Sequence, residues 1–154
     1  CKAVIPHMKE RSAKLKAQYP TFEARSAARP HAGAIINLTS IAGQSGFAGL
    51  AAYSVSQFGR SGLTRALALE LAEFHITCNA IAPGIVWTEL WDRLAQGMTE
   101  DGVDKMETFQ KKVEHFIPMK TAQLCEDMGD AALYFATAPN TTGQVLAVDG
   151  GYLA

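Results

Sequence analysis

The stretch GAIINLTSIAGQSGFAGLAAYSVSQFGRSGLTRALALELAEFHITCNAIAPG, residues 33–84, decides the fold of this chain. It opens with an apolar, β-branched run from Gly33 to Ser40 that is bounded by turn residues, which predicts a buried strand. After a glycine-rich loop, apolar and small residues recur at helical spacing from Tyr53 to about Phe74. His75 to Gly84 predicts a second strand and a turn. This order of strand, long helix and strand indicates an α/β fold with parallel strands.

The flanking sequence continues the alternation. Helical patterns cover residues 1–18, 88–98, 99–116 and 126–138, and a last strand with its turn covers 143–151. The three strands predict a small, doubly wound parallel sheet. The first strand, Ile35 to Leu38, is apolar throughout and so needs a neighbour on both edges, of which this chain offers one. Because the chain also begins at Cys1 inside a helical pattern without a cap, we expect it to be part of a longer polypeptide.

The composition limits the classes of function. The 154 residues are 48% hydrophobic and 19% charged, with a formal net charge of -1, which fits one folded domain without general affinity for nucleic acid or acidic membranes. No apolar run approaches the roughly 18 residues of a membrane span, and no signal peptide is apparent, so we expect a cytoplasmic protein. Three widely spaced cysteines indicate reduced thiols, and the four histidines lack metal-ligand spacing, so no metal is expected.

One segment departs from this neutral average. Between Lys9 and Ala32, six basic residues face two acidic ones. A basic patch for phosphate or nucleic acid is one interpretation, but no pattern of interleaved aromatic residues supports base stacking there. We therefore favour a solvated surface excursion and expect no nucleic-acid partner.

Hydroxyl groups and glycines follow the predicted strands. Ser40 ends the first strand, Pro83-Gly84 follows the second, and Asp149-Gly150-Gly151 follows the third. Because ligands of open parallel sheets bind beyond the carboxyl ends of the strands, these residues should share one edge of the sheet. Tyr53 begins the helix after Ser40, so a hydroxyl and a phenol should lie together at that edge. Carbonyl reduction needs such a pair, one group to polarise the oxygen and one to transfer the proton. Asp149 also fits a simpler role as a turn former.

Gln57 stands one helical turn after Tyr53. A free tyrosine has a pKa near 10, too high for a base at neutral pH, and a neighbouring cation lowers that pKa most effectively. Gln57 can donate a hydrogen bond but carries no charge, and Arg60 lies two turns from Tyr53, too far to act directly. The residue pattern alone leaves open a weakened acid–base site and a site that has lost its chemistry.

The string INLTSIAG…AAYSVSQFG…GLTRALALELA…ITCNAIAPGIVWTEL…TGQVLAVDGGYLA resembles the C-terminal half of a short-chain dehydrogenase/reductase. The resemblance covers nearly the whole chain and is weakest between Lys9 and Ala32. It implies a Rossmann-like fold, NAD or NADP as cofactor, and an N-terminal cofactor-binding half that is absent from residues 1–154. The pyrophosphate loop of the family belongs to that half, whereas Gly43 to Gly49 matches the active-site loop.

The resemblance also assigns roles to individual residues. Ser40 corresponds to the serine that holds the substrate oxygen, and Tyr53 corresponds to the general acid/base. Gln57 replaces a lysine that binds the nicotinamide ribose and lowers the tyrosine pKa. The residues expected to contact the nicotinamide are Pro83, Gly84, Ile85 and Thr88. The candidate substrate or lid residues are Gln44, Trp87 and Trp91, although the two tryptophans fit equally well as packing residues of the lid.

Two functional hypotheses follow from the resemblance. The first is an NAD(P)-dependent oxidoreductase that interconverts a secondary alcohol and a ketone; the lid segment resembles members acting on diols and sugar alcohols. The second is a non-catalytic binding or assembly module of the same fold, disabled by Gln57 or by truncation. Because family members pair the long helix across a subunit interface, the resemblance further implies a homo-oligomer, either a dimer or a tetramer.

Overall fold

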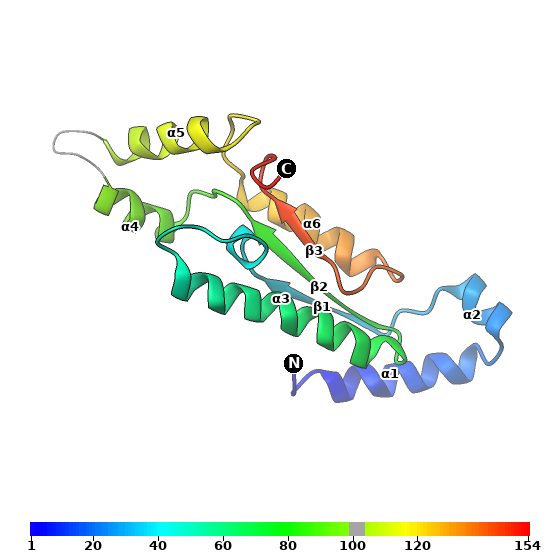
Figure 1. Ribbon diagram of the computed structural model, residues 1–154. Coiled ribbons are helices and arrows are strands. Elements are labelled where there is room, and N and C mark those ends of the chain that lie inside the picture. The colour runs from blue at the N-terminus through cyan, green and yellow to red at the C-terminus, as the bar shows by residue number, and fades with distance from the viewer. Residues whose placement is uncertain (99–103) are drawn as a thin grey trace.

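The computed structural model describes residues 1–98 and 104–154 and contains a parallel sheet at its centre (Figure 1). The strands are β1 (Gly33–Leu38), β2 (Ile76–Pro83) and β3 (Val145–Val148), and their order in the sheet is β1-β2-β3. Both pairings are parallel, with Gly33 opposite Ile76 and Ala80 opposite Val145. The α/β class and the parallel sheet predicted from the sequence are confirmed.

Helices cover both faces of the sheet, as the doubly wound prediction requires (Figure 1). The long helix α3 (Ala51–Ala72) packs on one face, where Ile35 of β1 contacts a core that includes Ala68 and Leu71. The helix α6 (Cys125–Thr137) packs on the other face, where Ile36 contacts a cluster that includes Phe135. Since neighbouring residues of a strand point to opposite faces, Ile35 and Ile36 serve different cores.

The middle strand is buried along almost its whole length and carries a buried polar brace. Asn79 is fully buried; its side-chain amide donates to the carbonyl of Thr141 (2.7 Å), and its carbonyl oxygen accepts from the backbone N–H of Gln144 (3.0 Å). These bonds join β2 to the turn that leads into β3. Buried polar groups that find partners help to fix a single register, so this brace fixes where β3 begins beside β2.

The first third of the chain differs from its prediction in two ways. The helix expected over residues 1–18 is α1 (Ile5–Gln18), and Pro6 lies in its first turn, where a missing N–H costs nothing. The expected surface excursion contains a second helix, α2 (Phe22–Ala28), whose N-terminus is capped by the side chain of Thr21. Because α2 has seven residues and buries none of them, its sequence carries no helical periodicity to detect.

The remaining boundaries lie close to the predicted ones. The helix α3 begins at Ala51, two residues before Tyr53. Two helices follow β2, namely α4 (Glu89–Met98) and α5 (Lys105–Phe116), which together form what we call the lid. The predicted helix 99–116 is confirmed from Lys105 onward, and its first residues, 99–103, lie outside the described part of the chain.

β1 forms one edge of the sheet within the described residues. It pairs with β2 alone, and Leu38 at its end is 57% exposed. This arrangement agrees with the expectation that the apolar first strand has a neighbour on one edge only. In the described ranges, no helix combines the length and apolarity needed to cross a membrane.

Candidate active site

Ser40 stands at the carboxyl end of β1, on a short turn that is locked to α3. It caps the 3-10 helix η1 (Ile41–Gly43), and its Oγ accepts from the backbone N–H of Ala42 at 3.2 Å. The hydroxyl of Thr39 donates to the carbonyl of Gln57 (3.0 Å), and the hydroxyl of Ser61 donates to the carbonyl of Gly43 (3.0 Å). Both of these bonds are buried, so they fix the distance between Ser40 and the helix that carries Tyr53.

Gly43 shows how closely this turn approaches α3. A Cβ at Gly43 would lie 2.6 Å from Thr39 Oγ1 and 2.7 Å from the carbonyl oxygen of Gln57. The second of these atoms belongs to the helix backbone and cannot move aside cheaply. Only glycine fits at this position, which explains one glycine of the loop without any need for a phosphate ligand.

Tyr53 and Gln57 occupy successive turns at the start of α3 but differ in burial. Tyr53 is 38% exposed, whereas Gln57 is 5% exposed. The amide nitrogen of Gln57 donates to Ser56 Oγ at 3.3 Å, while its oxygen Oε1 is buried without a hydrogen-bond partner among the described residues. A buried acceptor without a donor is costly, and the same burial closes this oxygen to solvent.

The Arg60 guanidinium bonds the end of β1. Its Nη1 donates to the carbonyl of Leu38 at 3.1 Å, which anchors α3 to the end of β1. This position agrees with the expectation that Arg60 does not supply the charge that a lysine at position 57 would bring.

The turn after β2 is held by a residue that the sequence pattern did not identify. Gln123 is buried, its Oε1 accepts from the backbone N–H of Ile85 (2.9 Å), and its own backbone N–H donates to the Ile85 carbonyl (3.2 Å). The same Oε1 would lie 2.6 Å from a Cβ at Gly84, so glycine is required there as well. Gln123 therefore positions the segment Pro83–Ile85. No local signal could have revealed it, because the contact joins residues far apart in the sequence.

Asp149 acts as a turn former after β3. Its two carboxylate oxygens accept from the backbone N–H groups of Gly151 (2.9 Å) and Leu153 (3.0 Å). Gly150 and Gly151 have positive φ angles of 62° and 89°, which glycine adopts without strain. The simpler of the two interpretations of Asp149 is thus confirmed. The turn places Tyr152 beside the other two strand ends.

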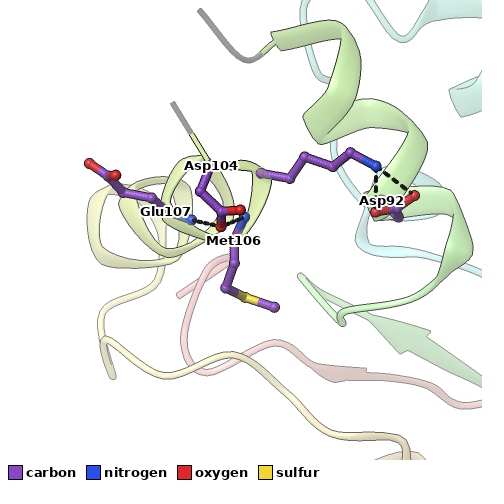
Figure 2. Close-up of polar contacts among 5 residues, drawn as sticks. Asp92, Asp104, Met106 and Glu107 are labelled. Carbon is purple, nitrogen blue, oxygen red and sulfur yellow. Dashed lines mark hydrogen bonds and ion pairs between the residues drawn. The ribbon is translucent and has the colours of Figure 1, made fainter. Parts of the chain in front are cut away.

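Side-chain contacts cap the second helix of the lid and join it to the first. Asp104 caps α5 by accepting from the N–H groups of Met106 (2.8 Å) and Glu107 (3.4 Å), as Figure 2 shows. Lys105 Nζ lies 3.0 Å from Asp92 Oδ1 and thereby ties α5 to α4. Both partners of this ion pair are partly exposed, so the ion pair orients the helices more than it stabilises them.

Two tryptophans attach the lid to its own core. The ring centroid of Trp87 lies 4.7 Å from that of Phe109, and the centroid of Trp91 lies 5.7 Å from it, both in edge-on geometry. Phe109 is buried together with Ile85 and Ile117. The packing interpretation of the two tryptophans is therefore confirmed, and Trp91 in addition faces the cavity described next.

A cavity of about 620 Å³ opens at the carboxyl ends of the strands, beneath the lid. Seven of the predicted site residues line it, namely Ser40, Tyr53, Pro83, Gly84, Ile85, Thr88 and Trp91. Gln57, Gln44 and Trp87 are not among its described lining residues. Gln44 instead follows η1 and buries an amide nitrogen that has no hydrogen-bond partner among the described residues. The structure thus brings the serine, the tyrosine and the turn after β2 together at one cavity.

Three aromatic rings on the cavity wall were not expected to meet. Tyr152 stacks on Phe116 with centroids 5.7 Å apart, and Phe47 contacts Tyr152 edge-on at 5.5 Å. The rings come from the loop after η1, the end of α5 and the turn after β3, so only the tertiary structure brings them together. Burial raises the pKa of the Tyr152 phenol, which stays protonated in the neutral range.

Comparison with known proteins identifies the family. The family profile described as enoyl-(acyl carrier protein) reductase matches residues 11–153. The crystal structure of a short chain dehydrogenase family protein from Francisella tularensis subsp. tularensis SCHU S4 superposes with a TM-score of 0.72 at 26% identity, covering 78% of this chain and 50% of that one. The chain belongs to the short-chain dehydrogenase/reductase family.

Two further members place the chain within this family. The L-2,3-butanediol dehydrogenase of Corynebacterium glutamicum is 40% identical over 124 residues, which cover 79% of this chain and 48% of that protein. L-sorbose reductase from Gluconobacter frateurii, complexed with NADPH and L-sorbose, gives a TM-score of 0.74 at 27% identity and covers 79% of this chain and 47% of that one. The chain therefore spans about half the length of the short-chain dehydrogenases that it matches.

Proposed function

We propose that the protein is an NAD(P)-dependent oxidoreductase that interconverts a secondary alcohol and a ketone. The observation that carries this proposal is the meeting of Ser40 and Tyr53 in one cavity with the turn Pro83–Ile85. A hydroxyl donor and a phenol at the carboxyl edge of a parallel sheet are the groups that carbonyl reduction requires.

Each of the two hydroxyl side chains has one task. The Ser40 hydroxyl donates a hydrogen bond to the substrate oxygen and fixes its position. The Tyr53 phenol gives a proton to that oxygen during reduction and takes one from it during oxidation. The buried bonds of Thr39 and Ser61 hold the two elements in register, so the substrate oxygen meets both groups at once.

The described residues fit one side of a nicotinamide cofactor. When bound, this cofactor would supply or accept the hydride. The turn Pro83–Ile85 offers a wall that is fixed by Gln123, and Thr88 offers a hydroxyl beside it. Gln57 is 5% exposed and is not among the described lining residues, so a ribose hydroxyl would reach its unpaired Oε1 only after the side chain turns toward the cavity. The remaining cofactor contacts come, in this proposal, from residues outside 1–154.

The family members reported above support the cofactor class without choosing between NAD and NADP. L-sorbose reductase contains NADPH. The substrates named for that enzyme and for the butanediol dehydrogenase belong to the diol and sugar class that the lid segment predicts, a class that the apolar lining of the cavity in this chain does not favour. The proposal also includes a homo-oligomer. Three apolar side chains on α3 are exposed, namely Val55 (75%), Leu63 (51%) and Leu69 (82%), and a second subunit could cover them.

The test is the rate of nicotinamide-coupled oxidation of secondary alcohols by the intact natural polypeptide, with NAD and NADP in turn. Tyr53→Phe should lower kcat by about 10²–10⁴-fold, because it removes the proton donor and acceptor. Tyr134→Phe is the matched control, since Tyr134 is exposed on α6 and bonds Thr141 rather than facing the cavity. Equal rates in the two variants would exclude the acid–base role.

Gln57 provides the test against a non-catalytic module. A lysine at this position adds a positive charge one turn from Tyr53, which favours the phenolate form and should raise the rate at neutral pH. Circular dichroism of Gln57→Lys checks that the buried substitution folds. A folded variant without activity toward any alcohol or ketone would favour a binding or assembly module and would exclude a weakened enzyme.

A further inference from the structure

The cavity beside Ser40 and Tyr53 has an unusual chemical composition. Among the described residues that line it there is no Asp, Glu, Lys, Arg, His, Asn or Gln. Its polar side-chain groups are hydroxyls, one thiol and the Trp91 indole N–H, and Ser40, Tyr53 and Thr88 already have roles in the proposed reaction. The Thr39 hydroxyl is engaged by the carbonyl of Gln57. Among the described lining residues, the Tyr152 phenol, the Trp91 indole N–H and the Cys125 thiol remain for further polar groups of a substrate.

The rest of the cavity wall is apolar and rich in rings. The aromatic side chains are Phe47, Trp91, Phe116 and Tyr152, and the aliphatic ones include Leu38, Leu50, Leu90, Leu94 and Met128. Several of them remain accessible to solvent, including Leu50 at 40%, Leu90 at 53% and Phe116 at 41%. A ligand that covers these side chains gains from removing apolar surface from water on both sides.

We propose that the substrate of this site is an apolar, ring-bearing secondary alcohol or ketone, and not a polyol. The proposal rests on the proposed function and names its substrate class. A polyol that enters the cavity exchanges water for hydrocarbon around most hydroxyls beyond the reacting one, because the described lining residues offer those hydroxyls no side-chain amide, carboxylate or cation. An alicyclic or aromatic body meets ring faces and edges instead.

The first experiment compares alcohols that share a cyclohexane ring. The intact natural polypeptide oxidises cyclohexanol, 4-methylcyclohexanol and myo-inositol in the presence of NAD or NADP, and kcat/KM is measured for each. We expect cyclohexanol to exceed myo-inositol by at least about 100-fold, and each methylene that the cavity buries to raise kcat/KM by about fourfold. An equal or higher kcat/KM for myo-inositol overturns the proposed substrate class while the oxidoreductase function stands.

A matched pair of variants locates the preference in this cavity. Leu90→Asn places an amide on the cavity wall, and Leu133→Asn makes the same change on α6, where the leucine is 64% exposed and does not line the cavity. The preference for 4-methylcyclohexanol over myo-inositol should fall by about tenfold or more in Leu90→Asn and remain unchanged in Leu133→Asn. Equal effects in the two variants would contradict the proposal.

A binding measurement separates this inference from the proposed reaction. Cys125 is exposed and lines the cavity, whereas Cys1 is exposed outside it. We expect 4-tert-butylcyclohexanone, with cofactor present, to slow alkylation of Cys125 by iodoacetamide about tenfold and to leave Cys1 unchanged, while myo-inositol protects neither. Protection without turnover would reject the proposed function and keep the ligand class. Turnover without selective protection would reject the ligand class alone.

Discussion

The two ends of the sheet carry opposite kinds of side chain. At the carboxyl end, the described residues lining the cavity are uncharged, and the turns beside it pack so closely that Gly43 and Gly84 leave no room for a Cβ. At the amino end, charged and titratable side chains contact the sheet and its helices; Lys9 Nζ lies 3.9 Å from the ring centroid of Phe74, and His31 bonds the Thr77 hydroxyl at 3.1 Å.

The difference teaches where this fold tolerates change. Positions at the carboxyl end are set by buried bonds between segments far apart in the sequence, so substitutions there alter stability and the site together. Positions at the amino end are set by partly exposed contacts, so substitutions there should alter stability slightly and activity not at all. The four predictions below test this contrast.

Gly43→Ala should have the largest effect. The new methyl group would meet the backbone carbonyl of Gln57, and overpacking of this kind destabilises a fold by about 1–3 kcal/mol. Thermal unfolding should show the loss, accompanied by reduced activity. Gly46→Ala is the control in the same loop, because no heavy atom lies within 4 Å of a Cβ at that position. Similar melting temperatures for the two variants would contradict the tight contact with α3.

Gln123→Ala should rank second. It leaves the buried N–H of Ile85 without its side-chain acceptor, which costs about 1–3 kcal/mol. Because this bond positions the turn Pro83–Ile85, the KM for the cofactor should rise more than kcat falls. Gln144→Ala serves as control, since Gln144 is exposed and its side chain bonds only Thr142. If the variant folds and its KM for the cofactor is unchanged, Gln123 stabilises the fold but does not position the cofactor.

Lys9→Met should have a small effect on stability alone. The substitution keeps the aliphatic stem and removes the charge above Phe74, a contact worth about 0.5–1 kcal/mol at exposed sites. Urea unfolding measures the difference, and Lys14→Met on the same helix is the comparison. A change in kcat/KM for any alcohol would contradict the expectation that substitutions at the amino end of the sheet leave activity unchanged.

His31→Gln should act through pH and have the smallest effect at neutrality. Burial, with a smaller contribution from Arg11, lowers the pKa of His31 below its ordinary value of 6.5. The unfolded chain therefore binds a proton more readily, so the stability due to neutral His31 is complete above pH 6.5 and is lost as the pH falls through the lowered folded-state pKa. Unfolding measured from pH 7.5 to 5 should show a shallower slope in His31→Gln than in the wild type. The control His7→Gln, at an exposed position of α1, should keep the wild-type slope.

Much of the fold was predictable because its signals are local. The apolar run in Gly33–Leu38, the helical period of α3 and the turn glycines after β3 each reveal an element within a few residues. The helix α2 was missed because a short, exposed helix needs no apolar period; its Thr21 cap and the bonds from Arg25 to the carbonyls of Tyr19 and Pro20 hold it.

The candidate site was predictable only in part, for a related reason. Ser40 and Tyr53 stand at fixed positions relative to a strand end and a helix start, so spacing alone places them near each other. The clamp by Gln123 and the ring contacts of Phe47 with Tyr152 depend on how distant segments dock. Pairs of this kind leave no pattern in a single sequence.

The hydrogen bonds between Gln123 and Ile85 have a consequence for how the lid can vary in length and sequence. Together with the bridge between Val86 and Gln123, they tie the two ends of the lid segment together at its base, next to the carboxyl end of β2. The entropy cost of closing such a loop grows only with the logarithm of its length, and doubling the length costs about 0.6 kcal/mol. The segment between Val86 and Gln123 can therefore change in length or sequence while the strand order and the positions of Ser40 and Tyr53 remain as they are.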